Sequence, residues 1–215
     1  MMSVRLSLFG GPLFFALWFV GAQVLYFASG GGPNGEPAPS ASAYPEAVLS
    51  NQSGVNGGAT LLVLAAVSLL LFAVGLRERT GSKSGLGLFP VLAMSGVSVL
   101  LILQAGLVVG SLQLADQAPA AAWNLRELSG SLGFESFITS LLGGFALAGV
   151  ILTTGSGFSR WFWWFTVVFT VILTVGGLLE GLGITPAGRF SILFGLWAFV
   201  AGFALQTDQK ATPAG

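Results

Sequence analysis

Long apolar runs separated by short polar segments dominate the pattern along the chain. A transmembrane helix needs about 20 mostly apolar residues to cross a hydrocarbon core of roughly 30 Å. The stretches that meet this requirement lie at about residues 6–28, 59–76, 86–115, 131–154, 161–183 and 190–206. The pattern therefore predicts an all-α polytopic membrane protein, a single domain over 1–215 built as a bundle of six transmembrane helices.

The first apolar stretch follows a short leader that contains Arg5, and it therefore also has features of a secretory signal peptide. The apolar core of a signal peptide spans about 7–15 residues, whereas this run is about 22 residues long. We therefore expect a retained transmembrane helix.

Basic residues in the connections predict the orientation, because Lys and Arg are retained on the cytoplasmic side of a membrane. Under the six-span arrangement, one side collects Arg5, Arg77, Arg79, Lys83, Arg160 and Lys210. Only Arg126 and Arg189 fall on the opposite side. The sequence thus predicts that both termini lie in the cytoplasm.

One long outer loop is predicted at 29–58. Its first part, SGGGPNGEPAPSASA, has the composition of a flexible linker. The following Tyr44-Pro-Glu-Ala-Val-Leu-Ser predicts a short helix, because Pro45 suits the first helical position and Glu46 lies near the positive end of the helix dipole. We expect this helix to lie against the outer surface.

The segment 119–130 is expected to extend the fourth span outward, with Pro119 in the first turn. Asn124, Glu127, Ser131 and Glu135 would then share one stripe of the helix. The outer end of this helix is therefore predicted to be amphipathic.

Trp161, Trp163 and Trp164 directly follow Arg160. Indole rings beside a basic anchor are typical of the aromatic belt at a membrane interface. An aromatic ligand cage is the alternative, and the belt is preferred because the cluster lies where the topology places an interface.

The composition agrees with a membrane protein and narrows its chemistry. Only 7% of residues are charged and the net charge is zero, so no nucleic-acid partner is indicated. The chain has no His and no Cys, which excludes His-ligated haem, His or Cys zinc sites, disulfides and a Ser-His-Asp triad. We expect no cofactor and no metal, and no catalytic residues can be assigned.

Ionisable residues at membrane depth are candidates for function. The helical rise places Glu135, Glu180 and Arg189 close to the outer boundary of their spans. The first interpretation is that they are ordinary interfacial residues whose side chains reach water. In the second, Glu135 and Glu180 face inward, with Arg126 or Arg189 as counter-ion, and close a cavity between the last three helices.

Two amides extend this candidate site. Gln104 lies deepest among the polar amides, and Gln23 lies in the outer part of the first span. A buried amide usually forms a hydrogen bond with a neighbouring helix, so Gln104 is expected to join helices.

Glycine recurs at the spacing of helix packing. Gly106-Leu-Val-Val-Gly110 and Gly177-Leu-Leu-Glu-Gly181 are GxxxG patterns, and each predicts close approach of helix backbones within the chain.

The layout as a whole resembles a family of small six-span membrane proteins of unknown function that is common in actinobacteria. The features that carry the resemblance are the loop segment PEAVLSNQS, the basic exit LRERTGSKSG, the outer segment AAWNLRELSGSLGFESF and the inner turn TTGSGFSRWFWWF. Relatives often have Pro before the Arg of that turn and Gly after it, and this chain lacks both. The resemblance implies the architecture and a bacterial plasma membrane, and it assigns no site residues.

These features favour a non-enzymatic accessory or sensory component, or a small carrier. The alternatives are an intramembrane enzyme acting on a lipid or isoprenoid, for which Glu127, Glu135 and Glu180 form the only plausible carboxylate cluster, and an assembly subunit of a larger membrane complex. The predicted partners are the lipid bilayer and a further membrane protein.

Overall fold

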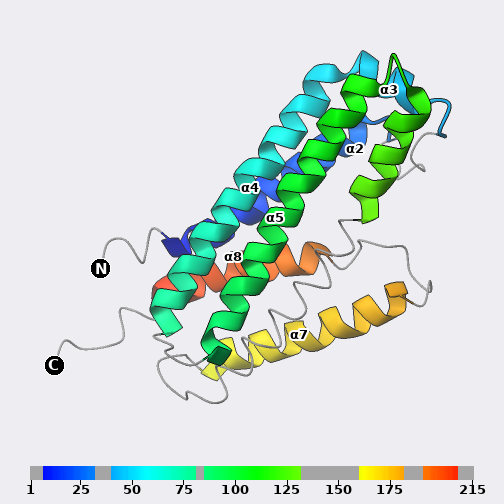
Figure 1. Cartoon of the computed structure of the whole chain (residues 1–215). Helices are drawn as coiled ribbons and strands as arrows, with labels where there is room; N and C mark the ends of the chain where they lie inside the picture. Colours follow the sequence, from blue (N-terminus) through cyan, green and yellow to red (C-terminus); the bar gives the residue numbers. More distant parts are fainter. Residues whose placement is uncertain (1–6, 32–39, 81–84, 132–159, 182–190, 208–215) are drawn as a thin grey trace.

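The computed structural model of the protein describes residues 7–31, 40–80, 85–131, 160–181 and 191–207, and their regular secondary structure is helical (Figure 1). The long helices are α2 (Gly10–Ala28), α4 (Gln52–Thr80), α5 (Gly85–Leu114), α7 (Arg160–Gly181) and α8 (Ser191–Thr207), and the short one is α3 (Tyr44–Ser50). Residues 119–131 are also helical. The predicted all-α class is confirmed for this part of the chain.

Three of the described helices are long and apolar enough to cross a membrane, over Gly10–Ala28, Gln52–Glu78 and Val91–Leu114. α7 and α8 carry shorter apolar segments, Trp161–Gly176 and Ile192–Gln206. The predicted fourth span, 131–154, lies outside the described residues after its first position. The described chain therefore has the character of a helical membrane protein.

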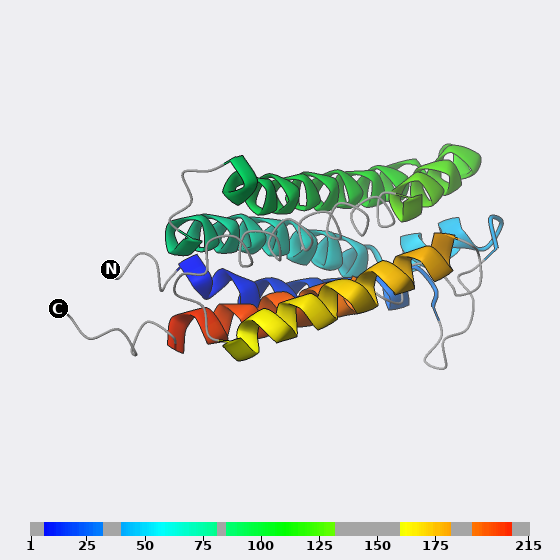
Figure 2. The same cartoon turned by 90° about the horizontal axis from the view of Figure 1, so that it is seen from below.

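The helices form an elongated bundle in which α2 contacts both α4 and α8, α4 also contacts α5, and α7 contacts α8. Figure 2 shows α4, α5, α7 and α8 side by side in projection, whereas Figure 1 shows α7 and α8 inclined to α4 and α5. The start of α2 meets the end of α8, where the rings of Phe9 and Phe203 are 6.5 Å apart. The short helix α3 lies at the opposite end of the bundle (Figure 1).

α2 approaches its two neighbours closely because glycine faces them at its start. A Cβ atom on Gly10 would overlap the backbone carbonyl of Ser68 in α4, and one on Gly11 would overlap that of Ala198 in α8. Small residues that let backbones approach are a main source of helix association in membranes, where lipid is as apolar as the side chains. These two positions determine how α2 sits between α4 and α8.

The GxxxG pattern of α5 behaves differently from the prediction. Among the described residues, a Cβ atom on Gly106 would meet nothing within 4 Å, and one on Gly110 would meet only the side chain of Leu125, at 3.3 Å. No described helix backbone therefore approaches α5 closely at Gly106, and the close approach predicted there is not found in this part of the chain. The side-chain positions of Gly177 and Gly181 lie outside the described part of the chain.

Aromatic rings fill the core at the end of the bundle away from α3. Phe14 contacts Phe194 at 5.9 Å between ring centroids, and Phe72 contacts Trp197 at 6.0 Å. Trp197 Nε1 donates a hydrogen bond to Thr166 Oγ1 of α7, at 3.3 Å. A buried indole N–H needs such an acceptor, so this bond joins α7 to α8.

The N-terminal part of α7 has one aromatic face buried in the bundle and another exposed. Phe162 is fully buried, Trp161 and Trp164 are half exposed, and Trp163, the third member of the predicted belt, is partly buried against the core. This arrangement suits the predicted interface belt, because a belt requires indole rings on the outside of the bundle. Their depth in a membrane stays a prediction.

Two glycines, Gly30 and Gly31, follow the C-terminal end of α2. Gly30 has a positive φ of 89°, Gly30 N–H donates to the Phe27 carbonyl, and Gly31 N–H donates to the Tyr26 carbonyl. These two bonds form a Schellman motif, which favours glycine because other residues are strained at positive φ. The motif ends the first span where the predicted outer loop begins.

α4 begins at Gln52, earlier than the predicted span 59–76. The polar, Gly-rich stretch QSGVNGG looks like loop in the sequence. Its helix is stabilised by tertiary contacts, because Val55 is fully buried against α3 and an added Cβ on Gly58 would collide with Leu25 of α2. The predicted loop 29–58 is therefore partly helical.

Candidate functional site

The end of the bundle at which α3 lies is a compact structure that we call the cap, formed by α3, residues 119–131 and the adjoining ends of α4 and α5. α3 turns Tyr44 and Val48 inward, where both are buried, and leaves Glu46 exposed. Beneath them, Val55, Leu112 and Ala122 complete a small apolar core. The predicted short helix is confirmed, with Pro45 in its first turn.

A buried hydrogen bond ties α3 to α5. The hydroxyl oxygens of Tyr44 and Ser111 are 2.7 Å apart. Ser111 uses its single proton to donate to the Val108 carbonyl, at 2.7 Å. Tyr44 is therefore the donor and the Ser111 oxygen the acceptor. The bond closes a separation of 67 residues along the chain.

Trp123 and Arg126 extend this contact to the surface. The Trp123 ring meets the Tyr44 ring edge to face, with centroids 5.8 Å apart. Arg126 lies over the Trp123 ring at 4.8 Å, in cation–π geometry. Arg126 also forms an ion pair with its neighbour Glu127. The four side chains form a continuous path from the buried Tyr44 hydroxyl to an exposed carboxylate.

The cap alters the acidity of its phenol. Burial raises the pKa of Tyr44 above its ordinary value, while the Ser111 hydrogen bond and the charge of Arg126 act in the opposite direction. The hydroxyl therefore stays protonated at neutral pH and keeps its role as a donor.

Arg126 is the one charged member of the predicted polar site whose side chain the structure describes. It is 30% exposed in its side chain and pairs with Glu127, which is 53% exposed. Glu135 and Arg189 lie outside the described residues, and Glu180 lies in the last turn of α7 with its side chain outside them. A shared site of these residues stays a prediction.

The two predicted amides take separate positions. Gln23 is exposed on α2, and Gln104 is half-buried on α5. The Gln104 backbone carbonyl, rather than its amide, accepts a hydrogen bond from Ser129 Oγ at 3.4 Å. This bond joins α5 to the helix at 119–131.

The predicted amphipathic stripe agrees with the structure where it is described. Asn124, Glu127 and Ser131 are all exposed, whereas Ala122 and Ser129 on the other face are buried. The cap thus presents a polar surface beside Arg126.

Tyr44 and Ser111 were not identified as partners in the sequence. Tyr44 before Pro45 marks the start of a helix, but a lone Ser in an apolar span carries no signal of its partner. Only the packing of α3 on α5 brings the two together.

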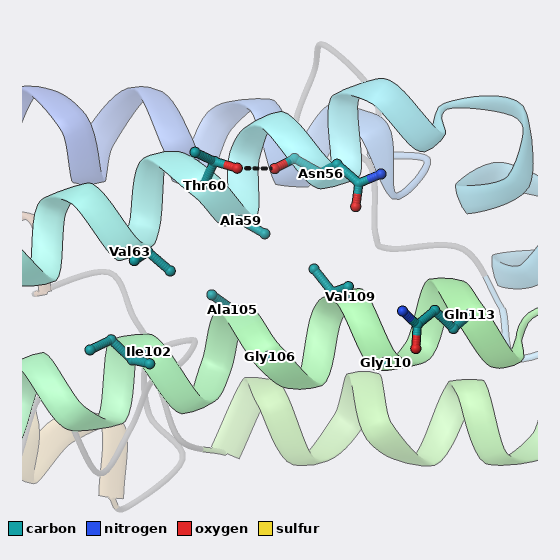
Figure 3. Close-up of a pocket in the computed structure, with 10 residues that line it drawn as sticks. All are labelled: Asn56, Ala59, Thr60, Val63, Ile102, Ala105, Gly106, Val109, Gly110 and Gln113. Carbon is teal, nitrogen blue, oxygen red and sulfur yellow. Dashed lines mark hydrogen bonds between the residues drawn. The ribbon is translucent and has the colours of Figure 1, made fainter.

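A second feature is a groove of about 460 Å³ between α4 and α5 (Figure 3). Its lining is uncharged and consists of Asn56, Ala59, Thr60, Val63, Ile102, Ala105, Gly106, Val109, Gly110 and Gln113. The polar members gather toward one end, where α4 and α5 approach the cap (Figure 3).

Within the described residues, no three His, Cys, Asp or Glu side chains lie together in a way that could hold a metal ion. This finding does not test the predicted cluster of Glu127, Glu135 and Glu180, because the side chains of Glu135 and Glu180 lie outside the described part of the chain.

The chain was compared with known proteins in sequence and in structure. No family model matches it, and no curated protein or solved structure matches it. The resemblance to the actinobacterial six-span family therefore stays a prediction.

Proposed function

We propose that the chain is a six-span protein of a bacterial plasma membrane with both termini in the cytoplasm. The contact between Phe9 and Phe203, near the start of α2 and the end of α8, supports this topology. An even number of crossings brings the two ends of a chain to the same side of a membrane. Arg77 and Glu78, at the far end of α4 from α3, are exposed, as expected for a cytoplasmic exit.

We infer that the protein is a non-enzymatic accessory component of a membrane assembly, with the cap as its recognition surface. The observation that carries this proposal is the chain of contacts from the Tyr44–Ser111 bond through Trp123 to Arg126. These contacts hold Arg126 and Glu127 in place before any partner arrives. A preorganised surface loses less conformational entropy on binding than a flexible loop does.

The charges on this surface suit a polar partner rather than the hydrocarbon of the bilayer. Asn124 and Glu127 offer donors and acceptors on the exposed face of this helix, and the half-buried Arg126 lies beside that face, paired with Glu127. Membrane-protein partners commonly meet such groups outside the hydrocarbon core. The proposed partner is the extramembrane part of another membrane protein.

Photocrosslinking in intact membranes tests this role. A benzophenone side chain at position 124 is expected to give a protein adduct of discrete mass, because Asn124 is exposed on the cap. The paired substitution Arg126→Ala and Glu127→Ala should reduce that adduct by about tenfold, corresponding to the loss of a charge-assisted contact.

Position 168 is the matched control, since Val168 is 48% exposed on the apolar surface of α7. It should give lipid adducts and no discrete protein adduct. The accessory role is overturned if position 124 also yields only lipid adducts while the protein is intact, or if the paired substitution leaves the protein adduct unchanged.

A further inference from the structure

The groove between α4 and α5 lies on two helices that are apolar and long enough to span a membrane. Its floor is sealed, because Ala59 and Ala105 are each only 3% exposed and pack with Leu62. Its walls, Val63 and Ile102, are exposed to the surroundings of the bundle. At membrane depth, these surroundings are hydrocarbon, and no described residue separates the side of the groove from lipid.

One end of the groove is polar. Asn56 on α4 and Gln113 on α5 face the groove from opposite walls (Figure 3). Neither side-chain amide forms a hydrogen bond with the described residues. The Thr60 hydroxyl donates to the backbone carbonyl of Asn56, at 2.8 Å, and not to its side chain. Within the described part of the chain, both amides therefore have N–H groups left to donate.

The depth of this polar end follows from α5. Gln113 is one residue from the end of α5 at Leu114, and the exposed Asp116 follows in the turn. A span that ends there places Gln113 near the membrane surface, on whichever side the cap faces. The glycerol esters of membrane lipids lie at this boundary between hydrocarbon and headgroups.

The size of the groove favours an extended chain over a helix. A ten-residue segment of helix about 10 Å wide occupies roughly 1,200 Å³. The groove offers about 460 Å³, which is in the range of small-molecule sites. A partner helix would enter it only in part and would leave the amides of Asn56 and Gln113 without acceptors.

We propose that this groove binds a fatty-acyl chain of an ester-linked membrane lipid, whose ester carbonyls accept hydrogen bonds from Asn56 and Gln113. The acyl chain lies over Ala59 and Ala105, between Val63 and Ile102. The absence of charge in the lining makes the site indifferent to the charge of the headgroup. This site is separate from the recognition surface of the cap, and neither proposal depends on the other.

Gly106 provides a way to block the site. Among the described residues, an added Cβ atom there meets nothing within 4 Å, so the larger side chain of Gly106→Leu is expected to extend into the groove that Gly106 lines. Gly57→Leu is the matched control, because Gly57 lies on α4, is outside the lining and also has open space around it.

The experiment uses the full chain in nanodiscs of ester-linked phosphatidylcholine that contain a trace of the same lipid with a diazirine in its acyl chain. After irradiation, peptide mapping should place most adducts on Val63, Ile102 and Val109, above the level at Val168 of α7, although Val168 is the more exposed residue. Gly106→Leu should lower the groove adducts by about tenfold, as expected for a site filled by four extra carbons. Gly57→Leu should leave them unchanged.

A second arm tests the amides. An ether-linked analogue with the same diazirine lacks the carbonyl acceptors, and it should label the groove about fivefold less, which corresponds to about one net hydrogen bond. Equal labelling by the two lipids overturns the assignment of Asn56 and Gln113.

Two results overturn the site itself. One is labelling spread evenly over the groove and α7 and insensitive to Gly106→Leu. The other is a dimer in native mass spectrometry that Gly106→Leu converts to a monomer, which would show a second copy in the groove. Each variant must elute as a single species of unchanged size for the mapping to be read.

Discussion

At the residue scale, the hydroxyls of Tyr44 and Ser111 decide how firmly α3 is held. Both are buried, and the Tyr44 hydroxyl depends on Ser111 as its acceptor, whereas the Ser111 hydroxyl donates to the Val108 carbonyl. A buried hydroxyl that loses its acceptor carries a desolvation cost, whereas a hydroxyl that is removed does not. The two residues are therefore not equivalent targets for mutation.

Ser111→Ala should destabilise the protein more than Tyr44→Phe does. Tyr44→Phe removes the donor and leaves Ser111 bonded to the Val108 carbonyl, at a cost of about 1 kcal/mol. Ser111→Ala leaves the buried Tyr44 hydroxyl without its acceptor, at about 1–3 kcal/mol. Thermal unfolding in detergent, monitored by circular dichroism, measures the loss of stability in each variant.

The double variant completes this cycle. With both hydroxyls absent, the unfolding free energy should return close to that of Tyr44→Phe alone. Ser42→Ala is the control with little expected effect, because the Ser42 hydroxyl lies in the turn before α3 and its hydrogen bond to the Ser40 hydroxyl is exposed to solvent. A loss in Ser111→Ala no larger than in Tyr44→Phe would contradict the assignment of donor and acceptor.

Alkaline pH should loosen the cap through the same phenol. Burial raises the pKa of Tyr44 in the folded state, so above the ordinary tyrosine pKa of about 10 the unfolded chain releases a proton that the folded chain retains. Stability is then present below about pH 10 and falls as pH rises through the unfolded and then the folded pKa. Melting temperatures from pH 7 upward should fall less steeply in Tyr44→Phe than in the unaltered protein, and parallel curves would contradict this.

At the element scale, two glycines have opposite roles in helix packing. Gly11 lies where α2 meets α8, and Gly106 borders the open groove on α5. Gly11 is in close contact with a neighbouring helix although it belongs to neither predicted GxxxG pattern, whereas Gly106 belongs to one and has no such contact among the described residues.

Matched alanine substitutions test this difference. Gly11→Ala places a Cβ against the Ala198 carbonyl and should destabilise the bundle by about 1–3 kcal/mol. Gly106→Ala meets no atom within 4 Å and should be neutral or stabilising by up to about 1 kcal/mol, because Ala is the better helix former. Equal shifts in melting temperature would contradict the close contact of α2 with α8.

At the scale of the whole molecule, the proposed topology can be tested directly because the chain has no Cys. Single substitutions Ser42→Cys and Asn124→Cys should react with a membrane-impermeant maleimide in intact cells. Ser82→Cys and Thr212→Cys should react only after the cells are opened. Labelling of Thr212→Cys in intact cells would overturn the proposal that both termini are cytoplasmic.

Local signals in the sequence predicted elements better than they predicted contacts. Pro45 and Glu46 were sufficient to predict α3, because the start of a helix depends on nearby backbone geometry. The start of α4 was missed since its Gly-rich first turns are stabilised by Leu25 and α3 rather than by their own propensity. Of the candidate site, the structure describes only the side chains of Arg126, Gln104 and Gln23, so a shared site with Glu135, Glu180 or Arg189 stays a prediction.

The sequence by itself determined the helical class and the apolar segments suited to a membrane. In lipid, the backbone groups of a helix must form hydrogen bonds within that helix. The length and apolarity of a segment are therefore enough to predict such a helix. Only the tertiary structure decided which side chains meet. The Tyr44–Ser111 bond, the approach of Gly11 to Ala198 and the open groove beside Gly106 depend on how helices pack. Apolar faces of similar composition allow many packings, and the shapes of the particular side chains select one.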